Sequence, residues 1–559
     1  MKRSIKQSSP HALRLASVLA TIALSSSAAF AADAYLDING TTAGSGLTVA
    51  AGSSTWSTSI WSSDSTGASA TVGWTDGDNA IFSAGTDANN NVRTLSITAV
   101  TVGNLTQEEG RVSMSGGTVT LAGTSVIYDV KTRTTADYDL LVNSVIANSA
   151  GGASSITKNG AGILQLNANN TFTGGVTLNQ GTLAFGDSAG TYFGSGTLTL
   201  AGGNFIKKYG PATNTEITVA NALNVTGTVN VGVVQQRPGN IKLTGTWGAG
   251  NSSAVFNVGN TAIEGLAILS STIIVQGDAS AYTGTFAHNT LAGTAGNRLR
   301  FGAANAGSTG YNASNAKFAT SGSTSGNNVL DLADGTYGTF KMGELSGTGG
   351  RIRAGWATGG NTTFEIGALN TSTSFAGNID NNVNGAGGLA AVNKVGSGTF
   401  TVTGAQGYTG GTTITAGTFA IGASDVLQNG GKITLAGGTL AINSGFTDTV
   451  GVLDLDASST ISIGSGATLI FADSNTQDWG GFSLSISGTF VSGSSIKFAT
   501  SGGLSSGQLA QISSNGYTNF GLDGSGFLTA SAIPEPSTFA IIAGFAVLGA
   551  TGFRRRRAG

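Results

Sequence analysis

The chain lacks several residues on which common kinds of protein chemistry depend. It has no cysteine, only two histidines and only five prolines among 559 residues. Without cysteine it forms no disulfide and offers no thiolate to a zinc ion or a catalytic triad. One histidine, His11, lies in an N-terminal segment that we expect to be removed. His288 then remains alone, and we expect it to be a surface residue without a functional role.

Charge is also scarce, at 10% of the residues, whereas glycine is abundant, with 89 residues. Disordered chains usually carry much charge or proline, and the 40% of hydrophobic residues here can support a core. Abundant glycine with scattered apolar residues is typical of short strands joined by tight turns. The 26 basic and 28 acidic residues show no basic patch, which argues against nucleic acid as a partner.

The N-terminus has the pattern of a secretory signal peptide. An apolar run at residues 15–24 is followed by the small-residue site Ala29-Phe30-Ala31. We therefore expect signal peptidase to recognise Ala29 and Ala31 and to leave a mature chain that begins near Ala32. An uncleaved anchor is the alternative. The run is preceded by four basic residues: Lys2, Arg3, Lys6 and Arg14.

The C-terminus combines three unlike elements in a fixed order. Pro534-Glu535-Pro536 is followed by a run without charge that extends to Phe553, and then by four arginines. As a helix the run would measure about 27 Å, enough to cross a membrane when flanking arginines reach the interface. The prolines mark the helix boundary, and the arginines favour the cytoplasmic side. The arginines are Arg554, Arg555, Arg556 and Arg557.

This arrangement resembles the PEP-CTERM sorting signal over residues 533–557. The resemblance implies that an exosortase-like enzyme of the bacterial inner membrane processes the signal and passes the protein outward, usually in cells that produce exopolysaccharide. The alternative is a plain single-span anchor in which Pro-Glu-Pro occurs by chance.

Two segments of the body repeat each other without a gap, Lys158 to Gly186 and Lys394 to Gly422. Apolar residues alternate with polar ones within each short stretch, as in half-buried strands, and glycines fall where the chain must turn. Each copy therefore predicts three short strands that form one turn of a stacked coil. Lys158 and Lys394 open the copies, and we expect them at solvated corners.

The two copies resemble the autotransporter-associated β-strand repeat, through a Lys-x-Gly-x-Gly start, a Tyr-Thr/Ser-Gly-Gly-Thr middle and a Gly-Thr-Leu end. The copy from Lys394 is the closer one, because the copy from Lys158 has Phe172 for the tyrosine and Val176 for the last threonine. The resemblance implies an all-β protein, an elongated right-handed parallel β-helix (β-solenoid), here with an N-terminal signal peptide and one C-terminal transmembrane helix. A self-exporting autotransporter would end in a barrel of amphipathic strands. The apolar C-terminal segment takes that place here, so we do not expect self-export.

These patterns divide the chain into seven parts. We expect a signal peptide, an N-terminal β-solenoid segment, a first clear repeat, a degenerate β-solenoid, a second clear repeat, a C-terminal lead-in and the sorting signal with its transmembrane helix. In that order the ranges are 1–31, 32–155, 156–203, 204–390, 391–480, 481–530 and 531–559.

Acidic pairs are the remaining candidates for catalysis or metal binding, because polysaccharide lyases and hydrolases also use β-helices. Asp76 and Asp78 lack the full spacing of a calcium loop, so we expect a polar turn there. The pairs Glu108/Glu109 and Asp331/Asp334 look isolated, although acid–base pairs that assemble in space leave no sequence pattern. We identify no catalytic residue, no metal ligand and no cofactor.

The sequence therefore predicts a non-enzymatic, structural or adhesin-like protein of the cell surface or extracellular matrix of a Gram-negative-type bacterium. It would pass through an inner-membrane intermediate, held by its C-terminal helix, and associate with exopolysaccharide. Two alternatives stay open: a β-helix polysaccharide lyase or hydrolase, and a membrane-tethered periplasmic scaffold that keeps its tail.

Overall fold

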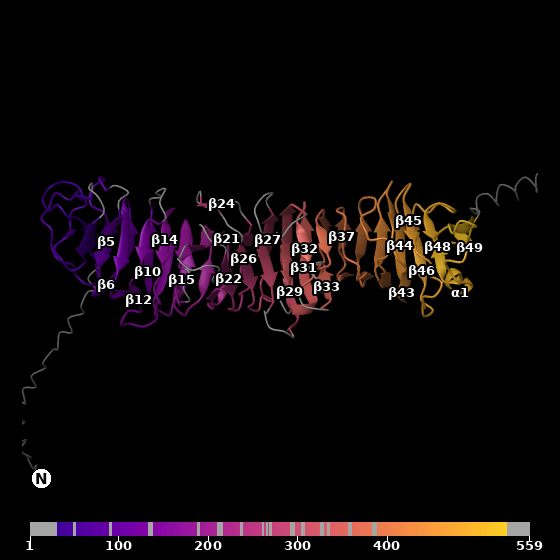
Figure 1. Cartoon of the computed structure of the whole chain (residues 1–559), viewed down its shortest axis with the longest axis horizontal. Helices are drawn as coiled ribbons and strands as arrows, with labels where there is room; N and C mark the ends of the chain where they lie inside the picture. Colours follow the sequence, from indigo (N-terminus) through magenta and orange to yellow (C-terminus); the bar gives the residue numbers. More distant parts are fainter. Residues whose placement is uncertain are drawn as a thin grey trace, which may run out of the picture.

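The protein is an elongated rod built from short parallel strands (Figure 1). The computed structural model describes residues 31–47, 52–88, 92–131, 138–186, 190–208, 216–234, 239–259, 262–263, 266–267, 271–290, 297–302, 308–324, 329–332, 336–355, 360–382 and 388–533. Within these ranges the one α-helix is α1 (Ser506–Ala510). The predicted all-β class and parallel β-solenoid are therefore confirmed for the described part of the chain.

The strands stack into ladders that run along the rod, and successive strands of the chain fall on different ladders. The first ladder joins β1 (Asp33–Leu36), β4 (Asn79–Phe82), β7 (Leu105–Gln107), β10 (Ser125–Val130), β13 (Ser155–Asn159), β15 (Gly175–Leu178), β17 (Leu198–Leu200) and β20 (Leu223–Val225). The ladder of β33 (Thr362–Ile366), β36 (Ala390–Lys394), β38 (Thr412–Ile414), β40 (Ile433–Ala436) and β43 (Leu453–Ala457) takes the equivalent position in the second repeat.

The longest ladder extends from one end of the rod to the other. It joins β2 (Gly52–Thr55), β5 (Val92–Ser96), β8 (Arg111–Ser115), β11 (Leu140–Val142), β14 (Ile163–Leu166), β16 (Thr182–Phe185), β18 (Asn204–Lys208), β21 (Thr228–Val234), β23 (Val255–Val258), β27 (Thr285–Thr290), β29 (Ser308–Gly322), β31 (Thr336–Gly347), β34 (Thr373–Phe375), β37 (Thr399–Val402), β39 (Thr418–Ile421), β41 (Thr439–Ile442), β44 (Ser459–Ile463), β46 (Leu484–Gly488) and β48 (Ile512–Ser514).

A third side of the coil consists of three shorter ladders. They are β6 (Ala99–Val102), β9 (Thr118–Leu121) and β12 (Val145–Ala147); β19 (Glu216–Val219), β22 (Gly239–Leu243), β26 (Ser271–Val275), β28 (Arg298–Phe301), β30 (Val329–Leu332), β32 (Arg351–Arg353) and β35 (Asn378–Asp380); and β42 (Thr447–Thr449), β45 (Thr468–Phe471) and β47 (Ile496–Phe498). A small hairpin, β24 (Ala262–Ile263) and β25 (Leu266–Ala267), adds to the side of the rod.

The core is a continuous column because apolar residues of successive turns fall in register. Phe256 pairs with Phe286, and Phe286 with Phe318, along the longest ladder. Their ring centroids lie 6.0 and 5.5 Å apart, and all three side chains are fully buried. Each turn thus covers the apolar residues of its neighbours, which one turn alone would leave exposed to water.

The repeated segment is longer than one turn of the coil, which corrects the prediction of one turn per copy. The copy that starts at Lys158 contains the end of β13 and all of β14, β15 and β16. Because β13 already pairs with β15, and β14 with β16, a full turn is complete before the copy ends. The third side of this turn has no strand, so one turn here carries two strands. The three strands predicted for the copy are present as β14, β15 and β16, and they span more than one turn.

A row of amide side chains runs along the longest ladder, on β18, β21, β23 and β27. Asn230 donates to Asn204 at 3.0 Å, Asn257 to Asn230 at 2.9 Å, and Asn289 to Asn257 at 2.9 Å. Ser321 extends the row by donating to Asn289. Each amide provides both a donor and an acceptor, so one residue type can satisfy its neighbours on both sides.

Different structures close the two ends of the coil. At the N-terminal end, β3 (Trp61–Ser62) pairs antiparallel with β1, and Trp56, Trp61 and Trp74 pack together with centroids about 5 Å apart. At the C-terminal end, β49 (Tyr517–Leu522) and β50 (Leu528–Ala532) form an antiparallel hairpin beside α1. Such caps protect the strand edges that the last turns would otherwise expose.

Replacing Gly411 with valine should destabilise the rod far more than replacing Thr401 with valine. Gly411 has φ +92°, and a Cβ there would lie 2.9 Å from the Lys432 carbonyl oxygen. Strain at such a position costs about 1–3 kcal/mol. Thr401 lies between the buried Phe400 and Val402 and is partly exposed, so valine there should change stability by less than about 0.5 kcal/mol.

Chemical denaturation of the two variants beside the wild type measures this difference. Equal midpoints for the two variants would contradict the assigned corner and strand register.

Candidate functional site

The predicted sorting residues follow the last strand of the rod in the sequence. Pro534, Glu535, Pro536 and Arg554 to Arg557 fall outside the described residues, as do Ala29 of the predicted cleavage site and the predicted transmembrane run. Ala31 is described and lies exposed just before β1. No helix among the described residues is both long and apolar enough to span a bilayer.

The last described residues are firmly attached to the body. β50 pairs with β49 through Tyr517 and Ala532, and the amide of Ile533 donates to the carbonyl of Gly516 at 2.8 Å. Ser492 holds the other side, because its hydroxyl donates to the Ala530 carbonyl at 3.1 Å and accepts from the Ala530 amide at 2.8 Å. The folded body therefore continues to within one residue of the Pro-Glu-Pro box.

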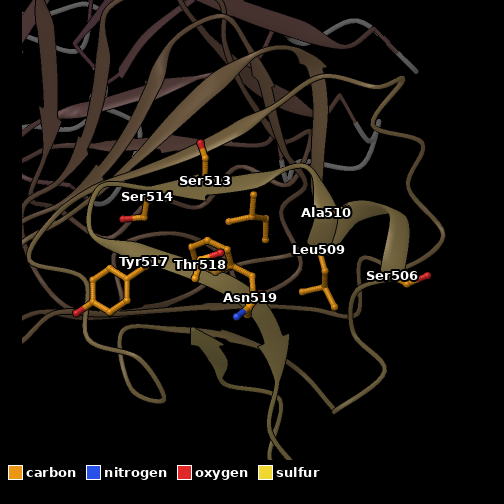
Figure 2. A pocket seen from close by; sticks show the side chains of 10 residues that line it. Ser506, Leu509, Ala510, Ser513, Ser514, Tyr517, Thr518 and Asn519 are labelled. Carbon is orange, nitrogen blue, oxygen red and sulfur yellow. The ribbon is translucent and has the colours of Figure 1, made fainter. Parts of the chain in front are cut away.

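A groove of about 470 Å³ opens beside this attachment point, between α1, β48 and β49 (Figure 2). Its size is that of a pocket for a small ligand or a protein side chain. The lining includes no charged residue. It consists of Ser506, Leu509, Ala510, Ile512, Ser513, Ser514, Tyr517, Thr518, Asn519 and Phe520. Sequence analysis did not find this groove, because its residues have no distinctive pattern and meet only when the hairpin folds back.

The helix that forms one wall is fixed by the residue that precedes it. Ser505 caps α1: its hydroxyl accepts from the Gln508 amide at 3.2 Å, while the Gln508 side chain accepts from the Ser505 amide at 2.7 Å. The buried Gln508 side chain also donates to the carbonyls of Ser474 and Gln477 in the preceding turn. The cap and the coil are therefore joined by hydrogen bonds as well as by packing.

Lys158 and Lys394 are buried, which corrects the prediction of solvated corners. The Lys394 ammonium donates to the carbonyls of Val395, Gly396 and Ala416 at 2.6, 2.9 and 3.3 Å. Lys158 makes the equivalent three bonds at 2.7, 2.8 and 3.2 Å. Burial lowers the pKa of Lys394 to about 8, and the three carbonyl oxygens compensate the charge that remains at neutral pH.

The glycines of Lys-x-Gly-x-Gly explain why the lysine can do this. Gly396 has φ +69°, and a Cβ there would lie 2.0 Å from the Gly367 carbonyl oxygen of the turn below. Only glycine fits at this corner, and the corner places the Gly396 carbonyl over the ammonium. The repeated motif is therefore a structural device that fastens a corner of the coil.

His288 is also buried, contrary to the predicted surface position. Its Nε2 lies 3.2 Å from the carbonyl oxygen of Asn297, and no described residue bonds to its Nδ1. Burial lowers the pKa of His288 to about 4, so the ring is neutral at pH 7. A signal was present in the sequence: His288 follows Phe286 by two positions in a strand, and both therefore face the core.

The acidic pairs make structural contacts. Asp76 and Asp78 flank the turn at Gly77, as predicted, and accept from the amides of Thr101 and Ala32 at 2.8 and 3.1 Å. Among the residues that the structure describes, no three His, Cys, Asp or Glu side chains come together as metal ligands would.

Glu108 and Glu109 turn to different partners. Glu108 lies 2.9 Å from the Lys131 ammonium, whereas Glu109 accepts from the Ala88 amide at 3.3 Å. Burial raises the pKa of Glu109.

Asp331 is not isolated, in contrast to the prediction. It is fully buried between Arg300 and Arg353, with nitrogen–oxygen distances of 3.0 and 3.2 Å. The three residues sit on adjacent strands of one ladder, β28, β30 and β32, in register. Only stacking brings them together, so their sequence positions could not reveal the triad. Asp334 lies outside the described residues.

Comparison with known proteins identifies the two motifs. A family model of the PEP-CTERM protein-sorting motif matches residues 532–557, and one of the passenger-associated-transport-repeat matches residues 156–185 and 392–421. Both resemblances drawn from the sequence are thereby confirmed. A stretch of 211 residues is 35% identical to the adhesin BmaC autotransporter of Brucella suis biovar 1 (strain 1330). The match covers 36% of this chain and 6% of that adhesin's length. No solved structure matches the chain.

The buried His288 should make the middle of the rod sensitive to acid. The unfolded imidazole binds a proton below about pH 6.5, but the folded one does so only near pH 4, so stability falls as the pH drops through this window. Between pH 7 and pH 5 we expect a loss of about 2 kcal/mol. His288→Gln, which keeps a donor near the Asn297 carbonyl and cannot titrate, should not show this loss.

Hydrogen exchange of the β27 amides at the two pH values measures the local stability. The variant is the necessary reference, because burial raises the pKa of Asp448 to about 6 and gives a dependence of opposite sign between about pH 4 and 6. The same pH dependence in both proteins would contradict the assignment.

Proposed function

We propose that the protein is an exported, non-enzymatic β-solenoid that serves as a structural or adhesive component of the bacterial cell surface or extracellular matrix. The observation that carries the proposal is the order of parts along the chain: a rod with passenger-type repeats (Figure 1) is followed directly in the sequence by a sorting motif. The sorting motif implies an exosortase-type processing system as the first partner.

Two features support export to the surface. The N-terminus has the pattern of a signal peptide that ends at Ala29-Phe30-Ala31, and the chain shares a stretch of sequence with an autotransporter adhesin. In the proposed route the C-terminal run holds the chain in the inner membrane until the box is processed, and the rod is then passed outward. Association with exopolysaccharide is part of the proposal.

The contacts of the candidate carboxylates support a role without catalysis. Acid–base catalysis needs carboxyl groups that face a substrate. Asp331 is enclosed between two arginines, Asp448 accepts from the amides of Val426 and Leu427 in the interior, and Glu108 pairs with Lys131. Asp331 and Asp448 are buried and thus poorly placed to react with a polysaccharide, whereas Glu108 is exposed and its contact is an ion pair at the surface.

Changing Pro534, Glu535 and Pro536 together to alanine should block processing without blocking export. The uncharged run and the arginines remain, so translocation and retention in the membrane should be unchanged. The variant should accumulate at full length in the inner membrane, while the wild type reaches the surface or medium without the segment that follows the box. Mass spectrometry of the C-terminus in fractionated cells measures this.

Thr218→Ala, on the exposed side of β19, is the matched control. The same fractionation and the same C-terminal residue for all three proteins would favour a plain membrane anchor.

The processed protein, purified from the surface or medium, should bind polysaccharide without shortening it. Co-sedimentation with acidic and neutral polysaccharides measures binding, and size-exclusion chromatography of the polysaccharides measures their length. Shortened chains would instead support the lyase or hydrolase reading.

A further inference from the structure

No linker separates the folded C-terminal end of the rod, where the groove lies, from the sorting box in the sequence. Ile533 is hydrogen-bonded to Gly516, whose neighbour Tyr517 lines the groove, and Pro534 follows Ile533 directly. Two residues of extended chain span at most about 7 Å. An enzyme that closes around Glu535 therefore meets the folded end of the rod at the same time.

Several hydrogen bonds hold β50, the strand that precedes the box, to the rest of the cap. The β49–β50 pairing, the two bonds between Ser492 and Ala530, and the bond from the Gly493 amide to the Leu528 carbonyl at 2.9 Å all hold β50 in place. Pulling β50 free would expose these groups and the fully buried Leu528 together. β50 and the groove thus belong to one folded surface, and the box follows β50 in the sequence after Ile533.

The chemistry of this surface suits a protein partner. The groove has no charged residue; its lining combines exposed hydroxyl and amide groups, on Ser513, Thr518 and Asn519, with the partly buried Leu509 and Phe520. An anionic sugar would find no cation here. Two of the exposed large apolar side chains, Val491 and Ile533, flank β50 at the same end, at 48% and 54% exposure. Mixed apolar and uncharged polar surface of this kind is typical of protein interfaces.

We propose that this cap face, the groove formed by α1, β48 and β49, is a docking surface for the membrane-bound enzyme that processes the Pro-Glu-Pro box. The inference rests on the proposed function and adds to it. Recognition extends beyond the box to the folded cap, which positions the box for cleavage. The enzyme would thereby act on a chain whose last turn has folded.

Full-length protein in the producing cells provides the test, with the fraction of processed C-terminus followed over time by pulse labelling and mass spectrometry. Thr518→Arg and Ser513→Arg place a large cation on exposed groove positions. Each should slow processing by about tenfold, the effect of losing one strong interface contact. Thr218→Arg, at a threonine on β19 that is also exposed, is the matched control and should be processed at the wild-type rate.

A flexible Gly-Ser insertion between Ile533 and Pro534 tests the same idea without touching the fold of the cap. It uncouples the box from the groove and should also slow processing. The proposal would be overturned if the groove variants and the insertion variant were processed at the wild-type rate. Faster processing of the insertion variant would overturn it too. Changed self-association with unchanged processing would assign the face to a second copy and would overturn it too.

These outcomes differ from a failure of the proposed function, which would appear as a wild type that is never processed or a box variant that is processed normally. If an arginine variant does not fold, judged by its thermal midpoint, the insertion alone decides.

Discussion

The structure depends on backbone hydrogen bonding between successive turns of a parallel coil. Each strand completes its bonds only when the next turn follows the same path, so every corner and every inward position must recur. Phe400 pairs with Phe419, and Phe419 with Leu440, because one interior position is used again in each turn. Burial of these side chains stabilises the stack, and removal of one such aromatic ring would cost about 3–5 kcal/mol.

The same constraint determines which hydrogen-bond partners the inward-facing polar side chains have. A polar residue at an inward position has no water, so its partner must come from its own corner or an adjacent turn. Lys394 reaches carbonyls at its own corner and at Ala416, 22 residues later, and Asp331 is held by arginines of the turns on both sides. The asparagine row from Asn204 to Asn289 applies the same solution at partly exposed positions. Buried polar groups here fasten one turn to the next.

Much of the fold could be predicted from sequence because its pattern is local. Alternation around Phe400 and Val402 gives strands, and glycines such as Gly396 and Gly411 give corners with positive φ. Lys158, Lys394 and His288 were wrongly predicted to lie at the surface, because the polarity of their side chains was given more weight than their place in the strand alternation. Each follows an inward residue by two, as His288 follows Phe286, and the alternation already predicted burial. The Arg300–Asp331–Arg353 triad and the C-terminal groove were out of reach, because both depend on which turns become neighbours.

The sorting motif makes the two ends of the rod different, because it follows the C-terminal cap in the sequence. The coil needs a cap at each end, and the C-terminal cap is completed by β50, the strand to which the box is attached. A chain whose last turn has not formed would offer the box on a loose strand, without the groove beside it. In a finished rod, β50 and the groove are joined in one folded cap. The strand that protects the last edge of the coil is therefore also the strand that the sorting motif follows in the sequence. Under the proposed docking, completion of the fold would precede the processing step that passes the protein outward.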